Sequence, residues 1–321
     1  MENKLLSIII PTFNGGKYLK ENLEALLPQV ASHIDEIEFL VCDNASEDET
    51  PQIVEEFQRS YTFIKYNRRD MNIGSMNNFA KAVHESNGQY VFLLGDDDVV
   101  MPHFVLIVLD VLKNNRNLGL FHWNRVDYIM NNDTYKLFDS AIQKNNLLYV
   151  EKDYAKYLKK CTMIDSMSTV LFRRDCWLEG EKYCKETYFG YLWLSIILNG
   201  AVDNTCAYYN FPLIIQRHPL VRKWDHKILL YRVGIHSLYR DLDKRVPTIM
   251  NVYEKIFGLT NLKKTSWMFE RVSANKAFYR ENYNFILEGL TKTSLKRMFI
   301  ISLKCPLFVT KIINKILRLY I

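Results

Sequence analysis

Two hydrophobic periods alternate along the first third of the chain. Short apolar runs rich in Ile, Val and Leu, each bounded by polar residues, are typical of buried strands. Segments with an apolar residue at every third or fourth position are typical of amphipathic helices. The pattern predicts strands at residues 5–10, 37–42, 63–66 and 90–94, and helices at residues 17–27, 51–57, 74–84 and 102–112.

Regular alternation of strands and helices predicts an α/β fold in which a mainly parallel sheet is covered by helices on both faces. In such sheets ligands bind beyond the carboxyl ends of the strands. The loops after Ile10, Cys42, Tyr66 and Leu94 are therefore expected to meet in one crevice. The polar residues of these loops are the first candidates for chemistry.

The pattern changes twice in the rest of the chain. Residues 118–219 are mixed, with predicted strands at 118–123, 169–172 and 214–217 and a predicted helix at 191–198. Beyond Trp224 the strand signals fade, and helices are predicted at residues 229–242, 246–257, 266–290 and 294–320. We therefore expect a boundary near Asp225, between a domain of residues 1–225 and a helical region of residues 226–321.

The composition is that of a folded globular protein, with 48% hydrophobic and 24% charged residues in a chain of 321. Six cysteines are scattered without a C-x-x-C pair, which indicates neither a zinc knuckle nor a dense disulfide framework. The N-terminus lacks the features of a secretory signal, and charged residues interrupt every stretch that approaches the roughly 20 apolar residues of a spanning helix. The sequence predicts a cytoplasmic protein.

The net charge of +6 is concentrated at the C-terminal end. The basic residues that follow the last acid, Glu288, are Lys292, Lys296, Arg297, Lys304, Lys311, Lys315 and Arg318. The rest of the chain is near neutral, which argues against nucleic acid as a partner. Basic residues seven apart among apolar ones, in a helix kinked at Pro306, are typical of an interfacial helix. We expect contact with the inner face of the cell membrane; the alternative is a helix docked on the body or in a homo-oligomer.

Three consecutive carboxylates, Asp96, Asp97 and Asp98, follow the predicted strand at 90–94. Adjacent carboxylates repel unless a cation or solvent offsets their charge. Mg²⁺ or Mn²⁺ held by one or two carboxylates and by substrate phosphates is the usual solution, and such a cation stabilises a departing diphosphate. On an extended chain Asp96 and Asp98 would project to the same face and share the cation. The alternative is a solvated acidic turn before Pro102.

Four motifs in order carry a resemblance to the inverting family-2 glycosyltransferases. They are SIIIPTFN at residues 7–14, VCDNASEDET at 41–50, NIG at 72–74 with Asn78, and FLLGDDD at 92–98. The resemblance covers about residues 5–125 and weakens toward residue 220. It implies a GT-A fold, a nucleotide-diphosphate sugar donor, UDP-sugar above all, and Mg²⁺ or Mn²⁺ as cofactor. Residues 1–125 would form the nucleotide-sugar half and residues 126–225 the acceptor half.

By this resemblance, Pro11, Thr12 and Asn14 belong to the first nucleotide-binding loop. Asp43 matches the acid that holds the base, usually uracil. A carboxylate suits that role because it accepts a hydrogen bond from an N–H of a pyrimidine edge. The alternative for Asp43 is an Asx-turn or a helix cap before Pro51.

Two further segments match donor-side parts of the family. Asn72 and Gly74 match a turn that closes over the nucleotide, and Asn78 is expected to brace this loop from the following helix. Residues 216–224 (QRHPLVRKW) lie where family members carry a flexible loop over the donor, which makes Arg217 and Arg222 candidates for diphosphate contact. Such a loop would exclude water from the donor. The alternative is an ordinary basic loop.

The aspartate run departs from the family pattern, in which a leucine, an aspartate and any residue precede two aspartates. Alignment on the final pair places Gly95 at the first acid and makes Asp97 the principal metal ligand, whereas extended geometry favours Asp96 with Asp98. Both registers stay open. The run GDDD is similar to the version in the abequosyltransferase-like branch, whose members decorate bacterial surface polysaccharides.

An inverting reaction needs a general base to take the proton of the acceptor hydroxyl. Family members supply it from a Glu–Asp pair at the start of a helix in the acceptor half, and the comparable segment 186–193 lacks this pair. Glu186 is the first candidate and Asp165 the second. The alternative is that both are ordinary surface acids.

Together these observations predict transfer of a sugar from a nucleotide-diphosphate donor to a saccharide acceptor in bacterial surface polysaccharide synthesis. A lipid-linked saccharide would suit an enzyme at the membrane. One alternative is a nucleotidyltransferase, although residues 12–17 (TFNGGK) offer only a faint phosphate loop. Another is a glycan- or nucleotide-binding protein on a decayed transferase fold.

Overall fold

The computed structural model describes residues 4–130, 133–137, 147–160, 164, 166–184, 191–218, 228–247, 249, 276–289 and 293–304. The chain divides into two compact units. The first comprises Met1–Tyr183 with Ile196–Leu220, and the second comprises Cys184–Ser195 with Val221–Ile321. The expected division near Asp225 stays a prediction, and nothing in the sequence pattern indicated that residues 184–195 join the second unit.

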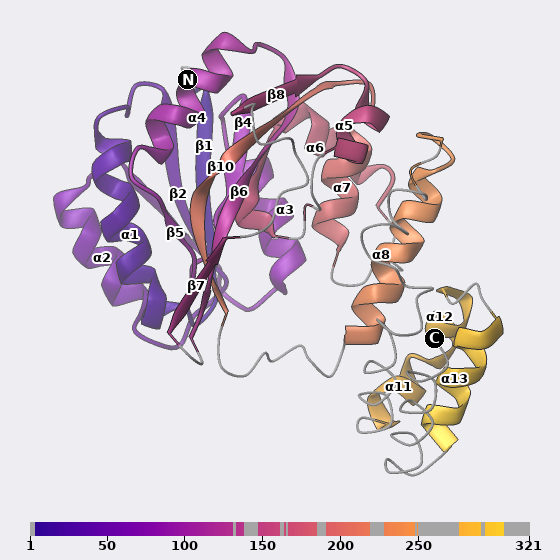
Figure 1. Cartoon of the computed structure of the whole chain (residues 1–321). Coiled ribbons are helices and arrows are strands. Elements are labelled where there is room, and N and C mark those ends of the chain that lie inside the picture. The colour runs from indigo at the N-terminus through magenta and orange to yellow at the C-terminus, as the bar shows by residue number, and fades with distance from the viewer. Residues whose placement is uncertain are drawn as a thin grey trace. The chain divides into compact units, whose positions relative to one another are not determined.

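The first half of the first unit is a series of strand–helix repeats (Figure 1). Its elements are β1 (Leu6–Thr12), α1 (Gly16–Ala31), β2 (Ile37–Asp43), α2 (Thr50–Ser60), β3 (Ile64–Arg68), α3 (Ser75–Glu85) and β4 (Tyr90–Leu93). All four strands are parallel, with β1 between β2 and β4 and with β3 outside β2. Every residue of β1, β2 and β4 is buried, as expected for strands covered on both faces. The alternation predicted from the sequence is confirmed.

The sheet continues with strands of both directions. β9 (Val170–Arg173) lies antiparallel between β4 and β6 (Leu118–Ile129), and β6 is parallel to β10 (Thr205–His218). The order is β3-β2-β1-β4-β9-β6-β10-β5, with β7 (Thr134–Leu137) on β6 and β8 (Leu148–Glu151) on β10. The antiparallel members were not predicted. β5 (Val99–Val100), β7 and β8 have two to four residues each, which is too short for a period to register.

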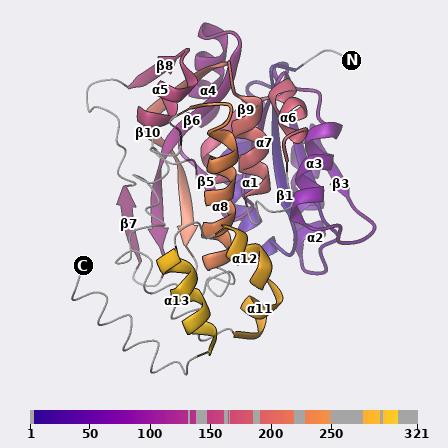
Figure 2. The same cartoon turned by 90° about the vertical axis from the view of Figure 1, so that its right-hand side faces the viewer.

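Helices cover both faces of this sheet (Figures 1 and 2). α1, α2 and α4 (Phe104–Asn114) lie on one face, and α3 and α6 (Arg174–Glu181) lie on the other. Phe104 of α4 packs on Phe92 and Trp123, with ring centroids 5.2 and 5.4 Å apart. Burial of a side chain of this size contributes about 1.5–3 kcal/mol, so this core holds β4 and the loop after it in place. The remaining elements are α5 (Tyr154–Lys160), the 3-10 turn η1 (Met167–Thr169) and α7 (Leu192–Gly200).

Most described residues of the second unit are helical. Its elements are α8 (Ile228–Leu242), α11 (Lys276–Glu281), α12 (Tyr283–Gly289) and α13 (Thr293–Lys304). The helix predicted at 229–242 is confirmed, and the one predicted at 266–290 is helical over its described part with a break at Asn282. The helix predicted at 246–257 falls almost entirely outside the described residues.

The described part of the basic C-terminal segment packs within its own unit. Phe299 of α13 is fully buried, stacks on Tyr283 and meets the edge of Tyr279. These contacts lie within the second unit, so membrane contact and its docked alternative both stay predictions. Residues 305–321, with the expected kink, lie outside the described residues. Among the helices described here, no helix has the length and apolar character needed to cross a membrane.

Candidate active site

Side-chain hydrogen bonds fasten the loops after β1 and β2 to each other. Asn14, in the left-handed region at φ 54°, donates its backbone N–H to Ser46 Oγ (2.9 Å) and accepts Glu47 N–H at Oδ1 (2.8 Å). Asparagine tolerates this backbone conformation better than most residues. The N–H of Asn44 donates to the carbonyl of Thr12 (2.9 Å). The predicted first loop is therefore held firmly against the second.

Asp43, at the end of β2, is fully buried with its oxygens engaged inside the chain. Oδ1 accepts the backbone N–H and the hydroxyl of Ser46 (2.8 and 2.6 Å), and Oδ2 accepts the hydroxyl of Tyr66 (2.6 Å). Burial and this bond raise the pKa of Tyr66, so its hydroxyl stays protonated and donating. Arg68 Nε lies 3.5 Å from Oδ2. Asp43 thus braces the loop after β2 through the backbone N–H three residues on, and both the Asx-turn alternative and contact of Asp43 with a base stay predictions.

Two asparagines close the loop after β3 onto the loop after β2. Asn44 donates to Asn72 Oδ1 (2.9 Å), which also accepts Gly74 N–H (2.8 Å), and Asn44 Oδ1 accepts Ile73 N–H (2.9 Å). Gly74 has φ 83° with ψ 151°, a conformation that is essentially restricted to glycine. The turn expected around Asn72 and Gly74 is therefore present beside the second loop.

Asn78 braces this loop from α3, as the sequence predicted. Its side-chain amide donates to the carbonyl of Cys42 (2.9 Å) and accepts Arg69 Nε (3.1 Å). Arg69 is itself buried and forms two hydrogen bonds with Glu85 (2.8 and 2.9 Å). Arg69 therefore has a structural role.

The aspartate run forms a turn and not an extended strand. Asp98 N–H donates to the carbonyl of Gly95 (3.2 Å), so the strand alternation expected to place Asp96 and Asp98 on one face does not hold. Asp96 points to the first loop, where the hydroxyl of Thr12 donates to its Oδ2 (2.6 Å). A Cβ at Gly15 would lie 2.1 Å from this oxygen. Glycine is therefore required for the close approach of these two loops.

Asp97 and Asp98 direct their carboxylates to the space beside Gly95. A Cβ built on Gly95 would lie 3.1 Å from Asp97 Oδ1, 3.2 Å from Asp98 Oδ2 and 3.2 Å from Ser168 Oγ. Ser168 Oγ also accepts the N–H of Gly95 (2.9 Å). Three oxygens from three residues therefore converge where a side chain is missing. This convergence gives a physical reason for glycine at the position of the family's first acid.

Burial opposes ionisation of these three carboxyl groups, and the charge of Asp97 adds to this effect at Asp96 and Asp98. Burial, followed by the charge of Asp97, raises the pKa of Asp98 to about 8. Burial is also the first cause that raises the pKa of Asp96 to about 6, and it raises the pKa of Asp97 although Arg217 and His218 oppose the shift. A bound cation would favour the ionised carboxylates and so offset this cost.

Arg217 joins β10 to the aspartate turn. Its N–H donates to Asp98 Oδ1 and its guanidinium donates to the carbonyl of Asp97, both at 3.1 Å. The guanidinium also pairs with Glu21 and lies over the ring of Tyr18, 5.2 Å from its centroid. Arg217 is thus placed beside the predicted metal ligands.

Two members of a polar cluster beside this turn, Arg125 and Asp127, were not predicted from the sequence. Asp127 on β6 pairs with Arg125 Nε (2.8 Å) and lies 3.1 Å from His218 Nε2. Burial would raise the pKa of Asp127, but His218 and Arg125 outweigh it and the pKa is lowered. Arg125 and His218 in turn interact electrostatically with the carboxyl groups of the aspartate turn. Polar residues at every second position past the predicted end of the strand, Arg125 and Asp127, were the available signal.

Within the described ranges, no group of three or more His, Cys, Asp or Glu side chains is arranged to hold a metal ion. Mg²⁺ and Mn²⁺ sites of transferases do not require such a cage, because one or two carboxylates and the substrate phosphates supply ligands. Asp97 and Asp98 offer two hard oxygen ligands beside Gly95, with Ser168 Oγ as a third oxygen. These residues fit a divalent cation.

The predicted donor-site residues that the structure describes all lie at the carboxyl edge of the sheet. They are Pro11, Thr12, Asn14, Asp43, Asn72, Gly74, Asp96, Asp97, Asp98 and Arg217. The two predicted bases, Glu186 and Asp165, and the predicted lid residue Arg222 lie outside the described residues, and their roles stay predictions.

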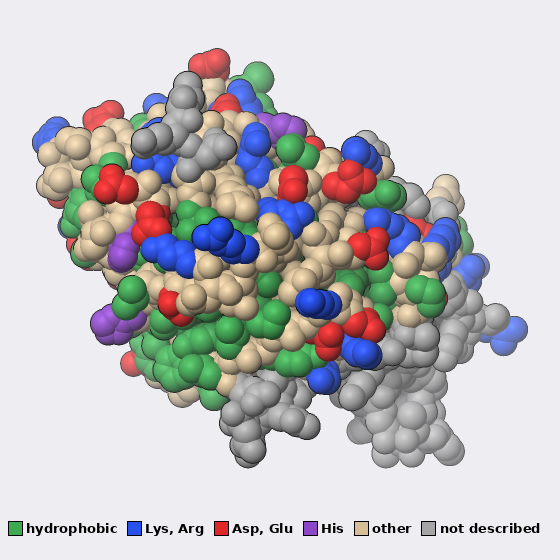
Figure 3. Space-filling model, turned by 90° about the horizontal axis from the view of Figure 1, so that it is seen from above, with side chains coloured by type: hydrophobic (Ala, Val, Ile, Leu, Met, Phe, Trp, Pro, Cys, Tyr) green, Lys and Arg blue, Asp and Glu red, His purple; other side chains and the backbone are tan. Residues whose placement is uncertain are grey.

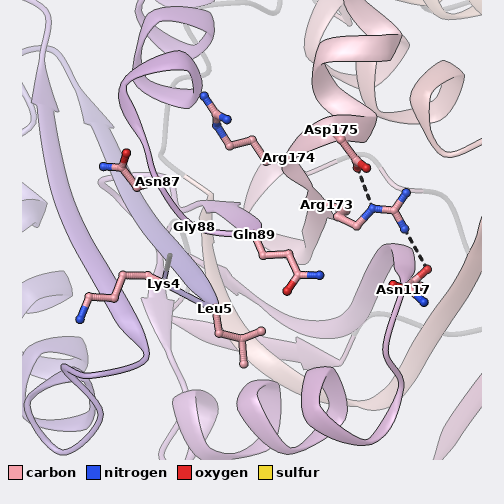
Figure 4. A pocket seen from close by; sticks show the side chains of 9 residues that line it. All are labelled: Lys4, Leu5, Asn87, Gly88, Gln89, Asn117, Arg173, Arg174 and Asp175. Atoms are coloured by element: carbon pink, nitrogen blue, oxygen red, sulfur yellow. Dashed lines mark hydrogen bonds and ion pairs between the residues drawn. The ribbon is translucent and has the colours of Figure 1, made fainter. Parts of the chain in front are cut away.

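A cavity of about 710 Å³ at the opposite, amino edge of the sheet has a different character (Figure 4). Arg173 pairs with Asp175 (2.7 Å), and Arg174 donates to the carbonyls that end α3. Lys4 donates to two backbone carbonyls at 3.0 Å. These cations serve fold contacts, so we do not assign the cavity to catalysis.

On the face seen from above, Lys and Arg side chains lie interspersed with Asp and Glu (Figure 3).

Comparisons with known proteins identify the family of the chain. The sequence profile described as "Glycosyl transferase family 2" matches residues 7–176, a span that includes the four motifs and the aspartate turn. The chain is 25% identical over 283 residues to abequosyltransferase RfbV of Salmonella typhimurium, covering 83% of this chain and 82% of that protein.

Solved structures share the fold across nearly the whole chain. TarS 1–349 of S. aureus in complex with UDP has a TM-score of 0.62 at 14% identity, covering 96% of this chain and 88% of that one. The mannosyltransferase PcManGT from Pyrobaculum calidifontis in complex with GDP-Man and Mn²⁺ has a TM-score of 0.54 at 13% identity, covering 98% and 88%. The predicted GT-A type of α/β fold is confirmed by these neighbours.

Proposed function

The chain is a glycosyltransferase that belongs to family 2, and we propose that it transfers a sugar from a nucleotide-diphosphate donor to a saccharide acceptor. The observation that carries the proposal is the convergence of Asp97, Asp98 and Ser168 oxygens beside Gly95. This point adjoins the contact between Thr12 and Asp96, where the loops after β1 and β4 meet. In such sheets this edge is where a nucleotide binds.

The donor in this proposal lies along the loops after β1, β2 and β3. The Asn14–Ser46 and Asn44–Asn72 bonds hold these loops in fixed positions, and preorganised loops lose less entropy on binding. The half-exposed guanidinium of Arg68 beside Asp43 offers a donor to a base or phosphate. The bound UDP of TarS and GDP-Man of PcManGT support a nucleotide-diphosphate donor, and the family role of Asp43 favours a UDP-sugar.

Asp97 and Asp98 are the residues that would hold Mg²⁺ or Mn²⁺. Such a cation stabilises the charge of a departing diphosphate. The N–H of Arg217 holds the Asp98 carboxylate, and Thr12 holds Asp96 toward the first loop. The Mn²⁺ in the PcManGT complex supports this part of the proposal.

The similarity to RfbV over most of the chain supports a saccharide acceptor in polysaccharide synthesis. We propose an inverting reaction on a lipid-linked saccharide, with Glu186 or Asp165 as the base. Residues 1–225 would form the catalytic domain and residues 226–321 a helical region at the cytoplasmic face of the membrane. Because Phe299 is buried, membrane contact would rest on exposed basic residues such as Arg297 and Lys304 and on the segment beyond.

The deciding experiment is a screen of UDP-, GDP-, CDP- and dTDP-sugars with and without Mn²⁺. We expect the wild-type protein to release a nucleoside diphosphate from one of them, and to do so only with the cation present. Release of pyrophosphate would instead identify a nucleotidyltransferase. Calorimetry that detects no nucleoside diphosphate binding with Mn²⁺ present would favour the decayed binding protein.

A further inference from the structure

Aromatic and cationic side chains form a line across three neighbouring strands beside the aspartate turn. Tyr135 on β7 is the register partner of Tyr128 on β6, and Tyr128 is the register partner of Arg217 on β10. Partnered residues of adjacent strands project to the same face of a sheet. We call Tyr135, Tyr128 and Arg217 the tyrosine row. In Figure 1, β7 lies at the lower end of the sheet, beside the ends of β6 and β10.

The outer part of the tyrosine row is an ordered aromatic surface open to solvent. The rings of Tyr128 and Tyr135 stack with centroids 4.7 Å apart and planes at 22°. The Tyr128 hydroxyl donates to Asp133 Oδ1 (2.8 Å) in the turn that joins the two strands, which fixes the ring. Tyr135 is 63% exposed, and Leu137 on the same face of β7 is 58% exposed. Large apolar groups held open in this way are typical of binding surfaces.

The inner end of the row, Arg217, contacts the aspartate turn. The Arg217 guanidinium donates to the carbonyl of Asp97 (3.1 Å) and lies over the ring of Tyr18. The Tyr18 hydroxyl in turn donates to Met130 Sδ at the end of β6 (3.8 Å). A molecule that lies along the row therefore has one end at the aspartate turn and the other in solvent.

We infer that the tyrosine row is an acceptor subsite that binds neutral pyranose units of a saccharide chain. The faces of a pyranose ring carry C–H groups that pack on aromatic rings, while its hydroxyls bond to polar tips such as those of tyrosine and arginine. The inference rests on the proposed function, because transfer requires a second substrate beside the donor. A stable protein interface buries a much wider surface than Tyr135 and Leu137 offer on β7.

Saturation-transfer NMR with maltohexaose and cellohexaose tests the inference without knowledge of the natural acceptor. The wild-type protein is expected to bind at least one of the two, and Tyr135→Ala to bind it about tenfold more weakly, the scale of one lost ring contact. Tyr135→Phe keeps the ring contact and loses only the hydroxyl, so it should bind more tightly than Tyr135→Ala. Lys136→Ala, on the opposite face of the same strand, is the matched control.

Two outcomes overturn the inference: a wild-type protein that binds neither oligosaccharide, and a Tyr135→Ala variant that binds with unchanged affinity. If a variant does not fold, the ring resonances of Tyr128 and Tyr135 in the wild-type protein decide, because they must shift on titration. Calorimetry with UDP and Mn²⁺ separates the two proposals. Saccharide binding without nucleotide binding would retain the row and refute the proposed donor reaction, and the reverse result would refute the row alone.

Discussion

The two edges of the same sheet carry buried carboxylates in opposite electrostatic states. Glu38, near the amino edge, is 4% exposed and accepts hydrogen bonds from Ser7 and Lys65, both at 2.6 Å. Burial alone would raise the pKa of Glu38, but its hydrogen bonds outweigh burial and lower it. Asp98, at the carboxyl edge, is also 4% exposed. Its pKa is raised to about 8, first by burial and then by the charge of Asp97.

Similar solvent exposure with opposite pKa shifts distinguishes a carboxylate that stabilises the fold from a carboxylate that is available to a ligand. A buried carboxylate with partners inside the chain stabilises the folded state relative to the same group left unpaired. A buried carboxylate beside a like charge opposes folding until a cation binds. Substitutions at the two edges should therefore affect different properties of the protein.

The largest effect is expected for Asp98→Asn, which removes a charged metal ligand with little change in size. Transfer should fall by at least about a hundredfold, and calorimetry should show weaker Mn²⁺ binding. Without metal the variant should melt at the same temperature or higher, because the cost of burying an ionisable carboxyl group, and then its repulsion from Asp97, is removed. Asp110→Asn, on the exposed side of α4, is the control. Full activity in Asp98→Asn would refute the metal assignment.

Glu38→Gln should show the converse pattern. Loss of the charged partner of Lys65 and of the bonds from Ser7 and Asn87 should lower the free energy of unfolding by about 2 kcal/mol. Denaturant titration measures this loss. The kcat should stay unchanged, since the site lies at the other edge of the sheet. A variant with unchanged stability and reduced kcat would reverse the comparison.

Because the pKa of Glu38 is lowered, the difference in stability between the wild type and Glu38→Gln should depend on pH. A carboxyl group whose folded pKa is depressed contributes stability above its unfolded pKa, and that contribution is lost as pH falls through the folded pKa. The advantage of wild type over Glu38→Gln should therefore shrink as pH falls below about 5. Thermal melts of both proteins across this window measure it. A difference that stays constant down to about pH 3 would contradict the assignment.

Gly95→Asp restores the acid that the family pattern places first, and we expect it to reduce activity about tenfold. Its Cβ would lie 3.1–3.2 Å from oxygens of Asp97, Asp98 and Ser168, and these oxygens would have to move. Gly95→Ala should lose about as much, because crowding and not charge is the cause. Steady-state kinetics of both variants decide: higher activity in Gly95→Asp would show that this chain accepts the family arrangement.

The parts of the fold that the sequence predicted are those set by local pattern. Each strand–helix repeat in the first 115 residues carries its own hydrophobic period, and its loop residues, such as Thr12 and Asn14, follow directly in the chain. The run at 95–98 was misjudged because a strand period was extended into it. Gly95 ends that strand, and the bond from Asp98 N–H to its carbonyl closes a turn.

The parts that the sequence could not predict depend on distant pairing. Val170–Arg173 reads as a strand, but its antiparallel place between β4 and β6 is set by tertiary contacts. Asp127 meets His218 only because β6 and β10 are neighbours, and Ser168 reaches Gly95 only because η1 packs beside β4. No period or motif in a single sequence reports such pairings.

Arg174→Ala, at the amino-edge cavity, is expected to have the smallest effect. The Arg174 guanidinium donates to the carbonyls of Val83 and His84 at the end of α3, each at 3.1 Å. Loss of these bonds should lower the free energy of unfolding by about 1 kcal/mol, with partial recovery in Arg174→Lys. Because the cavity lies away from the aspartate turn, kcat/KM should not change. A fall in kcat/KM without a fall in Tm would show that the cavity takes part in the reaction. It would refute the assignment of stability to the amino edge and of ligand binding to the carboxyl edge.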